Sequence, residues 1–208
     1  MKYFLFDIGN VLTNFDFPML LKAYADHSGQ PVGSHTDRDE FMYDRVEKGL
    51  ISDAEYIEYL NEAKGLSWTV DDLTATWQTI FTINEKGRGL FEQAVEAGIP
   101  VYTLSNIAQY HVDAIEKNWN GFFDKVTGLF MSYKMGVRKP DPSIYRMALE
   151  QLGADGSQCF FIDDLPENVA AARKEGIHAH HFIPENHQAI EDAAAAFFGF
   201  PYGELAQA

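Results

Sequence analysis

The chain has 208 residues, of which 46% are hydrophobic and 14% aromatic, and its formal net charge at pH 7 is −15. This length and composition suffice to bury one core, with room for a small inserted unit. The charge argues against nucleic acid and anionic membranes as partners, and no stretch approaches the roughly 20 apolar residues of a membrane span. The single cysteine, Cys159, lies in an apolar run and is expected to be a buried hydrophobe, which fits a reducing cytoplasm.

Short apolar runs alternate along the chain with segments of helical period, which is typical of a parallel sheet covered by helices on both faces. The predicted strands are residues 3–6, 99–104, 159–162 and 177–182. Polar residues end three of them, namely Asp7, the pair Ser105 and Asn106, and the pair Asp163 and Asp164. Because the carboxyl ends of adjacent parallel strands form the binding crevice of such a sheet, the three strand ends predict one site.

A helical section lies between the first two predicted strands. Its helix-start signals are capping side chains followed three residues later by an acid, in the pairs Asp37 and Glu40, Ser52 and Glu55, and Thr69 and Asp72. These helices predict a cap of residues 14–82 packed over the crevice, with residues 1–13 and 83–208 as the catalytic core. Glu47 and Lys48 fall between two of the predicted helices and are candidates for a specificity loop facing the crevice, although a solvated helix end would look the same.

The rest of the chain predicts three more helices. They are a helix near residues 107–117, a helix that Asp141 caps and that ends near Gly153, and a terminal helix over residues 186–198. The segment 122–128 carries no clear pattern, and its assignment stays open.

Four polar segments carry the chemistry. Asp7 ends a hydrophobic strand before a glycine turn, a position that by itself could also be a simple turn cap. Ser105 and the backbone donors after it can hold phosphate oxygens at a strand-to-helix junction. Lys139 precedes a helix and can offset negative charge, and the adjacent acids Asp163 and Asp164 repel each other unless a hard cation such as Mg²⁺ lies between them.

Asp7, Ser105, Lys139 and the Asp163-Asp164 pair match, in order, the four motifs of the haloacid dehalogenase-like superfamily, and the chain resembles that superfamily over nearly its whole length. The resemblance implies a Rossmann-like, three-layer α/β fold with a small helical cap. It also implies a magnesium-dependent phosphatase for a small phosphorylated metabolite, acting as a monomer or homodimer.

The resemblance assigns a role to each matching residue. Asp7 would attack phosphorus and form an aspartyl phosphate, while Lys139 would stabilise charge and help to bind the phosphoryl group. The phosphoryl group would also contact Ser105 and Asn106. The implied magnesium ligands are Asp7, the main-chain carbonyl of Gly9, Asp163 and Asp164, and Asn168 would orient a ligand.

The segments Phe-Asp-Ile-Gly-Asn-Val, Leu-Ser-Asn and Arg-Lys-Pro-Asp-Pro-Ser-Ile-Tyr are most similar to the bacterial branch that includes alpha-glucose-1-phosphate phosphatase, so hexose 1-phosphates are the expected substrates. One departure concerns Gly9. Most phosphatases of the superfamily have an aspartate there that acts as general acid, so the leaving oxygen must receive its proton from water, the substrate or a cap residue.

Three other functions remain open. A haloacid dehalogenase would also lack the second aspartate, but the acid pair favours a metal-dependent phosphatase. A sugar-phosphate mutase would differ from a phosphatase only in how water is excluded from the site. A non-catalytic scaffold is the third alternative, but it would leave an otherwise complete set of catalytic residues without a function. The histidines His178, His180 and His181 are expected to belong to a strand at the sheet edge rather than to a transition-metal site, because no matching ligand motif accompanies them.

Overall fold

A five-stranded parallel sheet forms the centre of the protein, in the order β5-β4-β1-β6-β7. The computed structural model describes residues 1–29, 31 and 36–199. The strands of this sheet are β1 (Tyr3–Phe6), β4 (Val101–Ser105), β5 (Gly128–Met131), β6 (Cys159–Asp163) and β7 (His178–His181). Because β1 has β4 on one side and β6 on the other, the strand order reverses there, and the crevice of such a sheet lies at the carboxyl end of β1.

Ten α-helices and two short 3-10 helices occur in the described part of the chain. The α-helices are α1 (Phe17–Ser28), α2 (Asp37–Glu47), α3 (Asp53–Lys64), α4 (Val70–Ile80), α5 (Glu85–Glu96), α6 (Gln109–Asn118), α7 (Ser132–Met135), α8 (Pro142–Leu152), α9 (Pro166–Lys174) and α10 (His187–Phe198). The 3-10 helices are η1 (Gly156–Gln158) and η2 (Pro184–Asn186). None of the described helices is long and apolar enough to span a membrane.

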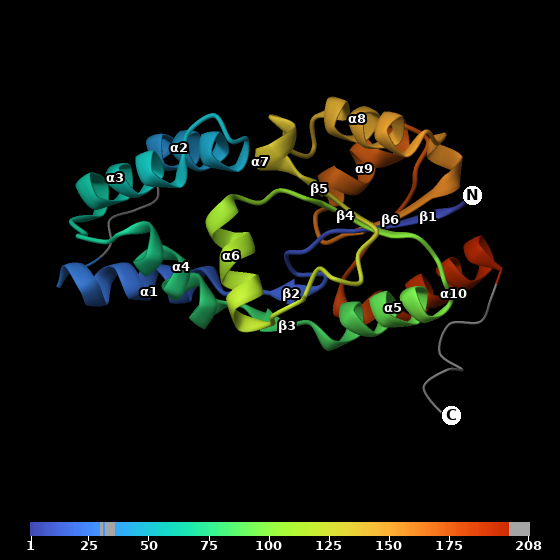
Figure 1. Cartoon of the computed structure of the whole chain (residues 1–208), viewed down its shortest axis with the longest axis horizontal. Coiled ribbons are helices and arrows are strands. Elements are labelled where there is room, and N and C mark those ends of the chain that lie inside the picture. Colours follow the sequence, from blue (N-terminus) through green and yellow to red (C-terminus); the bar gives the residue numbers. More distant parts are fainter. Residues whose placement is uncertain (30, 32–35, 200–208) are drawn as a thin grey trace.

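Helices cover both faces of the sheet, with α5 and α10 on one side and α8 and α9 on the other (Figure 1). The side chains of β1 alternate between these two layers. Phe4 and Phe6 pack in the cluster that contains Phe91 of α5, whereas Leu5 packs in the cluster that contains Ile144 of α8. A strand that is buried on both faces has to be apolar at every position, which explains why β1 is an unbroken hydrophobic run.

The helices α1 to α4 form a unit inserted after the first strand of the sheet (Figure 1). The unit is entered through β2 (Thr13–Asn14) and left through β3 (Thr82–Ile83), and these two short strands pair antiparallel. Helix α6 packs against α4, where Asn118 donates a hydrogen bond to the main-chain oxygen of Gln78 at 2.7 Å. The inserted helices are therefore fixed to the core by a helix that itself begins just after β4.

Two details differ from the sequence-based expectation. The cap of α2 is Thr36, not Asp37, because the Thr36 hydroxyl accepts a hydrogen bond from the Asp39 amide at 3.2 Å. Thr36 to Asp39 and Asp37 to Glu40 are overlapping copies of one capping pattern, so the pattern alone does not select between them. The segment 122–128, which carries no clear pattern in the sequence, leads into the edge strand β5 and ends at its first residue, Gly128. The capping pairs predicted at Ser52 and Thr69, and the Asp141 cap of α8, are confirmed.

Candidate active site

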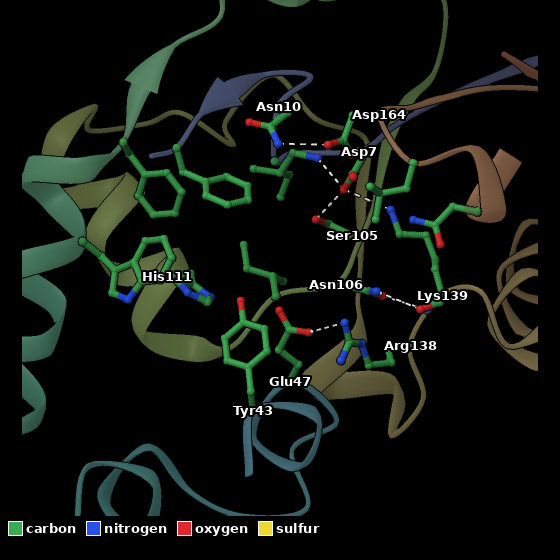
Figure 2. Close-up of a pocket in the computed structure, with 18 residues that line it drawn as sticks. Asp7, Asn10, Tyr43, Glu47, Ser105, Asn106, His111, Arg138, Lys139 and Asp164 are labelled. Atoms are coloured by element: carbon green, nitrogen blue, oxygen red, sulfur yellow. Dashed lines mark hydrogen bonds and ion pairs between the residues drawn. The ribbon is translucent and has the colours of Figure 1, made fainter. Parts of the chain in front are cut away.

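Polar side chains from three neighbouring strands meet at the carboxyl end of the sheet (Figure 2). Asp7 follows β1, Ser105 ends β4 and Asp163 ends β6, and the amide of Asp7 donates to the main-chain oxygen of Ile162 at 3.0 Å. The parallel register places these strand ends level with one another. The structure therefore brings together the residues that sequence reasoning placed at separate strand ends.

Asp7 is a buried carboxylate whose hydrogen bonds and ion pair with the described residues all fall on one oxygen. Its Oδ1 accepts hydrogen bonds from the Ile8 amide and the Ser105 hydroxyl, each at 2.7 Å, and lies 3.0 Å from Nζ of Lys139. Burial raises the pKa of Asp7 to about 7, since desolvation and the two neighbouring acids outweigh the favourable lysine and serine contacts. The fixed Oδ1 orients the carboxylate and leaves Oδ2 as the oxygen that can react.

Lys139 is buried between two acids, with only 2% of its surface exposed. Its ammonium group pairs with Asp7 and with Asp163, and these two acids raise its pKa despite the opposing effect of burial. Lys139 also lines the cavity beside the acids, so its side chain is enclosed by the protein while it remains part of the site. A buried cation with two anionic partners holds both carboxylates in place.

Asn106 holds the main chain of Lys139. Its side-chain oxygen accepts from the Lys139 amide at 2.7 Å, and its side-chain nitrogen donates to the Lys139 carbonyl at 2.9 Å. The Asn106 side chain thus holds the main chain at Lys139 in place. Ser105, in contrast, points its hydroxyl at Asp7.

Asp7, Asp163 and Asp164 form a group of oxygen ligands whose nearest atoms all lie within 4.8 Å of one another. Asp163 already accepts hydrogen bonds from the Leu165 amide and the Asn168 side chain, each at 2.9 Å, which places Asn168 as its orienter. Burial raises the pKa of Asp164. Three carboxylates beside one lysine carry excess negative charge, and hard oxygen donors of this kind suit Mg²⁺.

The turn after Asp7 brings two further residues to the acids. Asn10 adopts a left-handed conformation with φ of 53° and donates a hydrogen bond to Asp164 at 2.9 Å. Sequence reasoning missed Asn10, although an asparagine after a glycine turn is a known signal for this conformation. Gly9 lines the same cavity, and a Cβ placed on it would lie 3.1 Å from a ring carbon of Phe15. The Phe15 ring thus lies against the space that a side chain at position 9 would need.

A cavity of about 220 Å³ connects the acids to the inserted helices. At its far end lie aromatic side chains from the inserted helices, together with His111 of α6 and Glu47 of α2 (Figure 2). The aromatic lining includes Phe15, Tyr43, Trp77 and Phe81. The cavity therefore has charged side chains at one end and an aromatic wall at the other.

Of the two candidate specificity residues, only Glu47 lines the cavity. Its side chain is buried and lies 3.2 Å from the guanidinium of Arg138, which is not oriented to donate a hydrogen bond to it. Burial raises the pKa of Glu47, and Arg138 opposes this effect. Lys48 instead pairs with Asp44 of α2 at 2.8 Å, away from the cavity lining.

Arg138 is a site residue that sequence reasoning did not single out. It precedes Lys139 and lies within 4.0 Å of three acids on α2, namely Glu40, Asp44 and Glu47. The Arg-Lys pair is visible in the sequence, but only the fold shows that Arg138 turns to the inserted helices and Lys139 turns to Asp7.

The histidine-rich segment and Cys159 both lie in strands of the sheet. The histidine-rich strand is β7, which forms one edge of the sheet, and His181 contacts the main-chain oxygen of Asp164 at 2.8 Å. Cys159 is fully buried, and burial raises its pKa to about 11, so its thiol is not activated.

Known proteins of similar sequence and structure include several hydrolases. A D-ribitol-5-phosphate phosphatase from Bacteroides thetaiotaomicron is 22% identical, covering 89% of this chain and 93% of its own length. A sesquiterpene phosphatase from Aspergillus oryzae is 27% identical, covering 85% of this chain and 87% of its own length. A HAD family enzyme from B. thetaiotaomicron, solved with magnesium and inorganic phosphate, superimposes with a TM-score of 0.75 at 27% identity, covering 87% of this chain and 93% of that one. Residues 1–176 match the haloacid dehalogenase-like hydrolase family, and the chain belongs to that family.

Proposed function

We propose that this protein hydrolyses small phosphate monoesters with Mg²⁺, through a phosphorylated Asp7. The observation that carries the proposal is the arrangement at the strand ends, where a buried, oriented carboxylate lies beside a lysine and two further acids. The similar enzyme from B. thetaiotaomicron that was solved with magnesium and phosphate supports it.

Each residue of the site has a part in the proposed reaction. Oδ2 of Asp7 attacks phosphorus, the bond between phosphorus and the ester oxygen breaks, and the alcohol leaves with a proton taken from water, the substrate or a cap residue. Oδ1 stays bound to Ser105 and the Ile8 amide, so the carboxylate does not rotate. Lys139 balances charge on Asp7 as the phosphate approaches. In the second half of the reaction, water attacks phosphorus and releases Asp7 as a carboxylate.

Asp7, Asp163, Asp164 and the main-chain carbonyl of Gly9 are the groups that would hold Mg²⁺. When bound, the ion neutralises the acids and the phosphate so that an anionic nucleophile can approach an anionic ester. Both Asp163 oxygens already have partners, so its main contribution is negative charge, while Asp164 is held toward the site by Asn10.

We further propose that residues 14–82 act as a cap that selects the alcohol part of the substrate. The cap supplies the aromatic wall of the cavity, and Glu47 of α2 reaches the cavity from it. A closed cavity excludes bulk water during phosphoryl transfer, which strengthens the electrostatic interactions inside it.

Hexose 1-phosphates are the substrates we propose first. Gly9 has no side chain, so position 9 supplies no general acid, and esters with a more acidic leaving hydroxyl depend less on one. The D-ribitol-5-phosphate phosphatase supports a polyhydroxylated substrate. Aromatic rings can stack on a sugar face, and Glu47 can accept hydrogen bonds from its hydroxyls.

A phosphate ester of an apolar alcohol is a second candidate. Phe15 and Leu165 line the cavity yet remain 38% and 42% exposed, so an apolar chain could extend from the cavity along them. The sesquiterpene phosphatase supports this alternative.

A phosphate-release assay tests the proposal. Wild-type protein with Mg²⁺ is incubated with hexose 1-phosphates, other sugar phosphates, phenyl phosphate and prenyl phosphates, and the released phosphate is measured. We expect turnover that chelator or Asp7→Asn abolishes. Halide release from 2-haloacids in chelator would instead identify a dehalogenase, phosphate transfer without release would identify a mutase, and no turnover of any kind would favour a scaffold.

A further inference from the structure

His111, in the first turn of α6, has one ring nitrogen committed to the main chain. Its Nδ1 accepts a hydrogen bond from the amide of Ala108 at 3.2 Å. A neutral imidazole that accepts at Nδ1 carries its proton at Nε2. Burial lowers the pKa of His111 to about 3, so the ring stays neutral at physiological pH and Nε2 remains a hydrogen-bond donor.

The Nε2 donor of His111 is buried without a hydrogen-bond partner among the described residues. The residue is 3% exposed and lines the same cavity as Asp7. Around the imidazole lie the rings of Trp77, Phe81 and Tyr43, with centroids 4.3, 6.0 and 6.4 Å away. Ring faces are weak acceptors, and a buried donor without a partner destabilises the folded protein, so an unpaired donor at a cavity wall calls for a ligand.

A matching acceptor lies in the same cavity. Oε2 of Glu47 is buried and lies 3.2 Å from the guanidinium of Arg138, but it accepts no well-aligned hydrogen bond among the described residues. Figure 2 shows Glu47 and His111 on the side of the cavity away from Asp7, with Glu47 paired to Arg138. A hydroxyl group can accept from one residue and donate to the other, whereas a hydrocarbon satisfies neither.

We propose that His111 determines specificity by donating a hydrogen bond from Nε2 to a hydroxyl oxygen on the alcohol part of the substrate. This inference rests on the proposed phosphatase function, because it places the phosphate at Asp7 and the alcohol at the aromatic end of the cavity. It favours hydroxylated alcohols over purely apolar ones.

A purely structural role for His111 is the competing explanation. Position 108 is an alanine, so helix α6 lacks a side-chain cap of its own, and the histidine ring satisfies the Ala108 amide instead. Substitution of His111 could therefore harm activity by loosening the helix start.

Three variants separate the two roles. His111→Phe keeps a ring but loses both hydrogen bonds, and His111→Gln keeps one acceptor and one donor. His111→Phe combined with Ala108→Ser adds back a helix cap without the donor.

The test measures kcat/KM for the best hydroxylated ester and for phenyl phosphate, which has no hydroxyl, with melting temperatures alongside. We expect kcat/KM of His111→Phe to fall about tenfold for the hydroxylated ester, because one hydrogen bond to the substrate is lost. For phenyl phosphate, kcat/KM should stay within about twofold of the wild-type value. His111→Gln should recover part of the loss, and the double variant should recover melting temperature but not kcat/KM.

Three results would overturn the inference. They are equal losses on the two esters, full recovery of kcat/KM in the double variant, and wild-type activity on phenyl phosphate alone. Failure of the wild-type protein to release phosphate from either ester with Mg²⁺ is a different result, since it refutes the proposed function itself.

Discussion

The raised pKa of Asp7 predicts that the metal-free protein loses stability as the pH rises. The folded protein binds the Asp7 proton up to about pH 7, whereas an exposed aspartate releases it near 3.8. Between these values the folded state holds more protons than the unfolded state, so the free energy of unfolding falls as pH increases and levels off above pH 7. Between pH 5 and pH 8 the fall due to Asp7 is about 3 kcal/mol.

Asp7→Asn removes this titration, so the variant should gain stability relative to wild type as the pH rises. For a chain of this size, 3 kcal/mol corresponds to roughly 6 to 12 °C in melting temperature. The variant also loses its ion pair with Lys139, whose raised pKa keeps it charged between pH 5 and pH 8. This loss therefore lowers the stability of the variant by a similar amount at every pH in this range and does not change how the stability difference between the two proteins varies with pH.

Thermal melts in chelator at pH 5 and pH 8 measure the difference between the two proteins. Added Mg²⁺ should raise the melting temperature of wild type at pH 8 more than that of Asp7→Asn, because the ion binds the ionised carboxylate. If the two melting temperatures move in parallel between pH 5 and pH 8, Asp7 does not titrate in this range and the argument fails.

Four other outcomes follow from the site. Lys139→Ala should cost about 3–5 kcal/mol of stability in addition to activity, because it leaves two buried acids without their cation, and urea unfolding at pH 8 that shows a loss below about 1 kcal/mol would contradict this. Asp164→Ala should abolish the rise in melting temperature caused by Mg²⁺, and a rise that persists would remove Asp164 from the ligands. Glu47→Gln should change relative kcat/KM across a substrate panel, whereas the control Lys48→Gln should not. Wild type should have a higher kcat/KM for glucose 1-phosphate than for glucose 6-phosphate, and Gly9→Asp should reduce the ratio of these two kcat/KM values. A wild-type preference for the 6-phosphate would show that another group supplies the proton.

The sequence was informative where a local pattern determines the structure. Strands β1 and β6 are unbroken apolar runs buried on both faces, and each ends at a polar residue, so their positions could be predicted closely. Capping pairs such as Ser52 with Glu55 place helix starts because they satisfy amides that have no partner in the helix. Strand β5 was not predicted, because it is a short edge strand beginning at a glycine and following a segment without periodicity.

The cavity wall could not be predicted, because it depends on contacts between distant segments. Nothing near position 111 in the chain shows that its imidazole meets Trp77 of α4. The sequence likewise does not reveal that Asn106 turns to the main chain of Lys139, since this contact joins two loops 33 residues apart. The motifs identify the groups that meet at the strand ends, whereas the packing of α4 on α6 decides what else faces them.

The pairing of β2 with β3 has a consequence for how such an enzyme can be altered. Thr13 pairs with Ile83 and Asn14 with Thr82, so the inserted helices leave and rejoin the core at neighbouring points. A segment whose ends are already held together can be exchanged for another without moving the strands that carry the reacting acids, since little extra chain entropy is needed to join it. If the inserted helices select the substrate as proposed, exchange at this junction gives variants with new substrates in which Asp7 and its partners keep their positions, provided that the replacement helix also packs against α6.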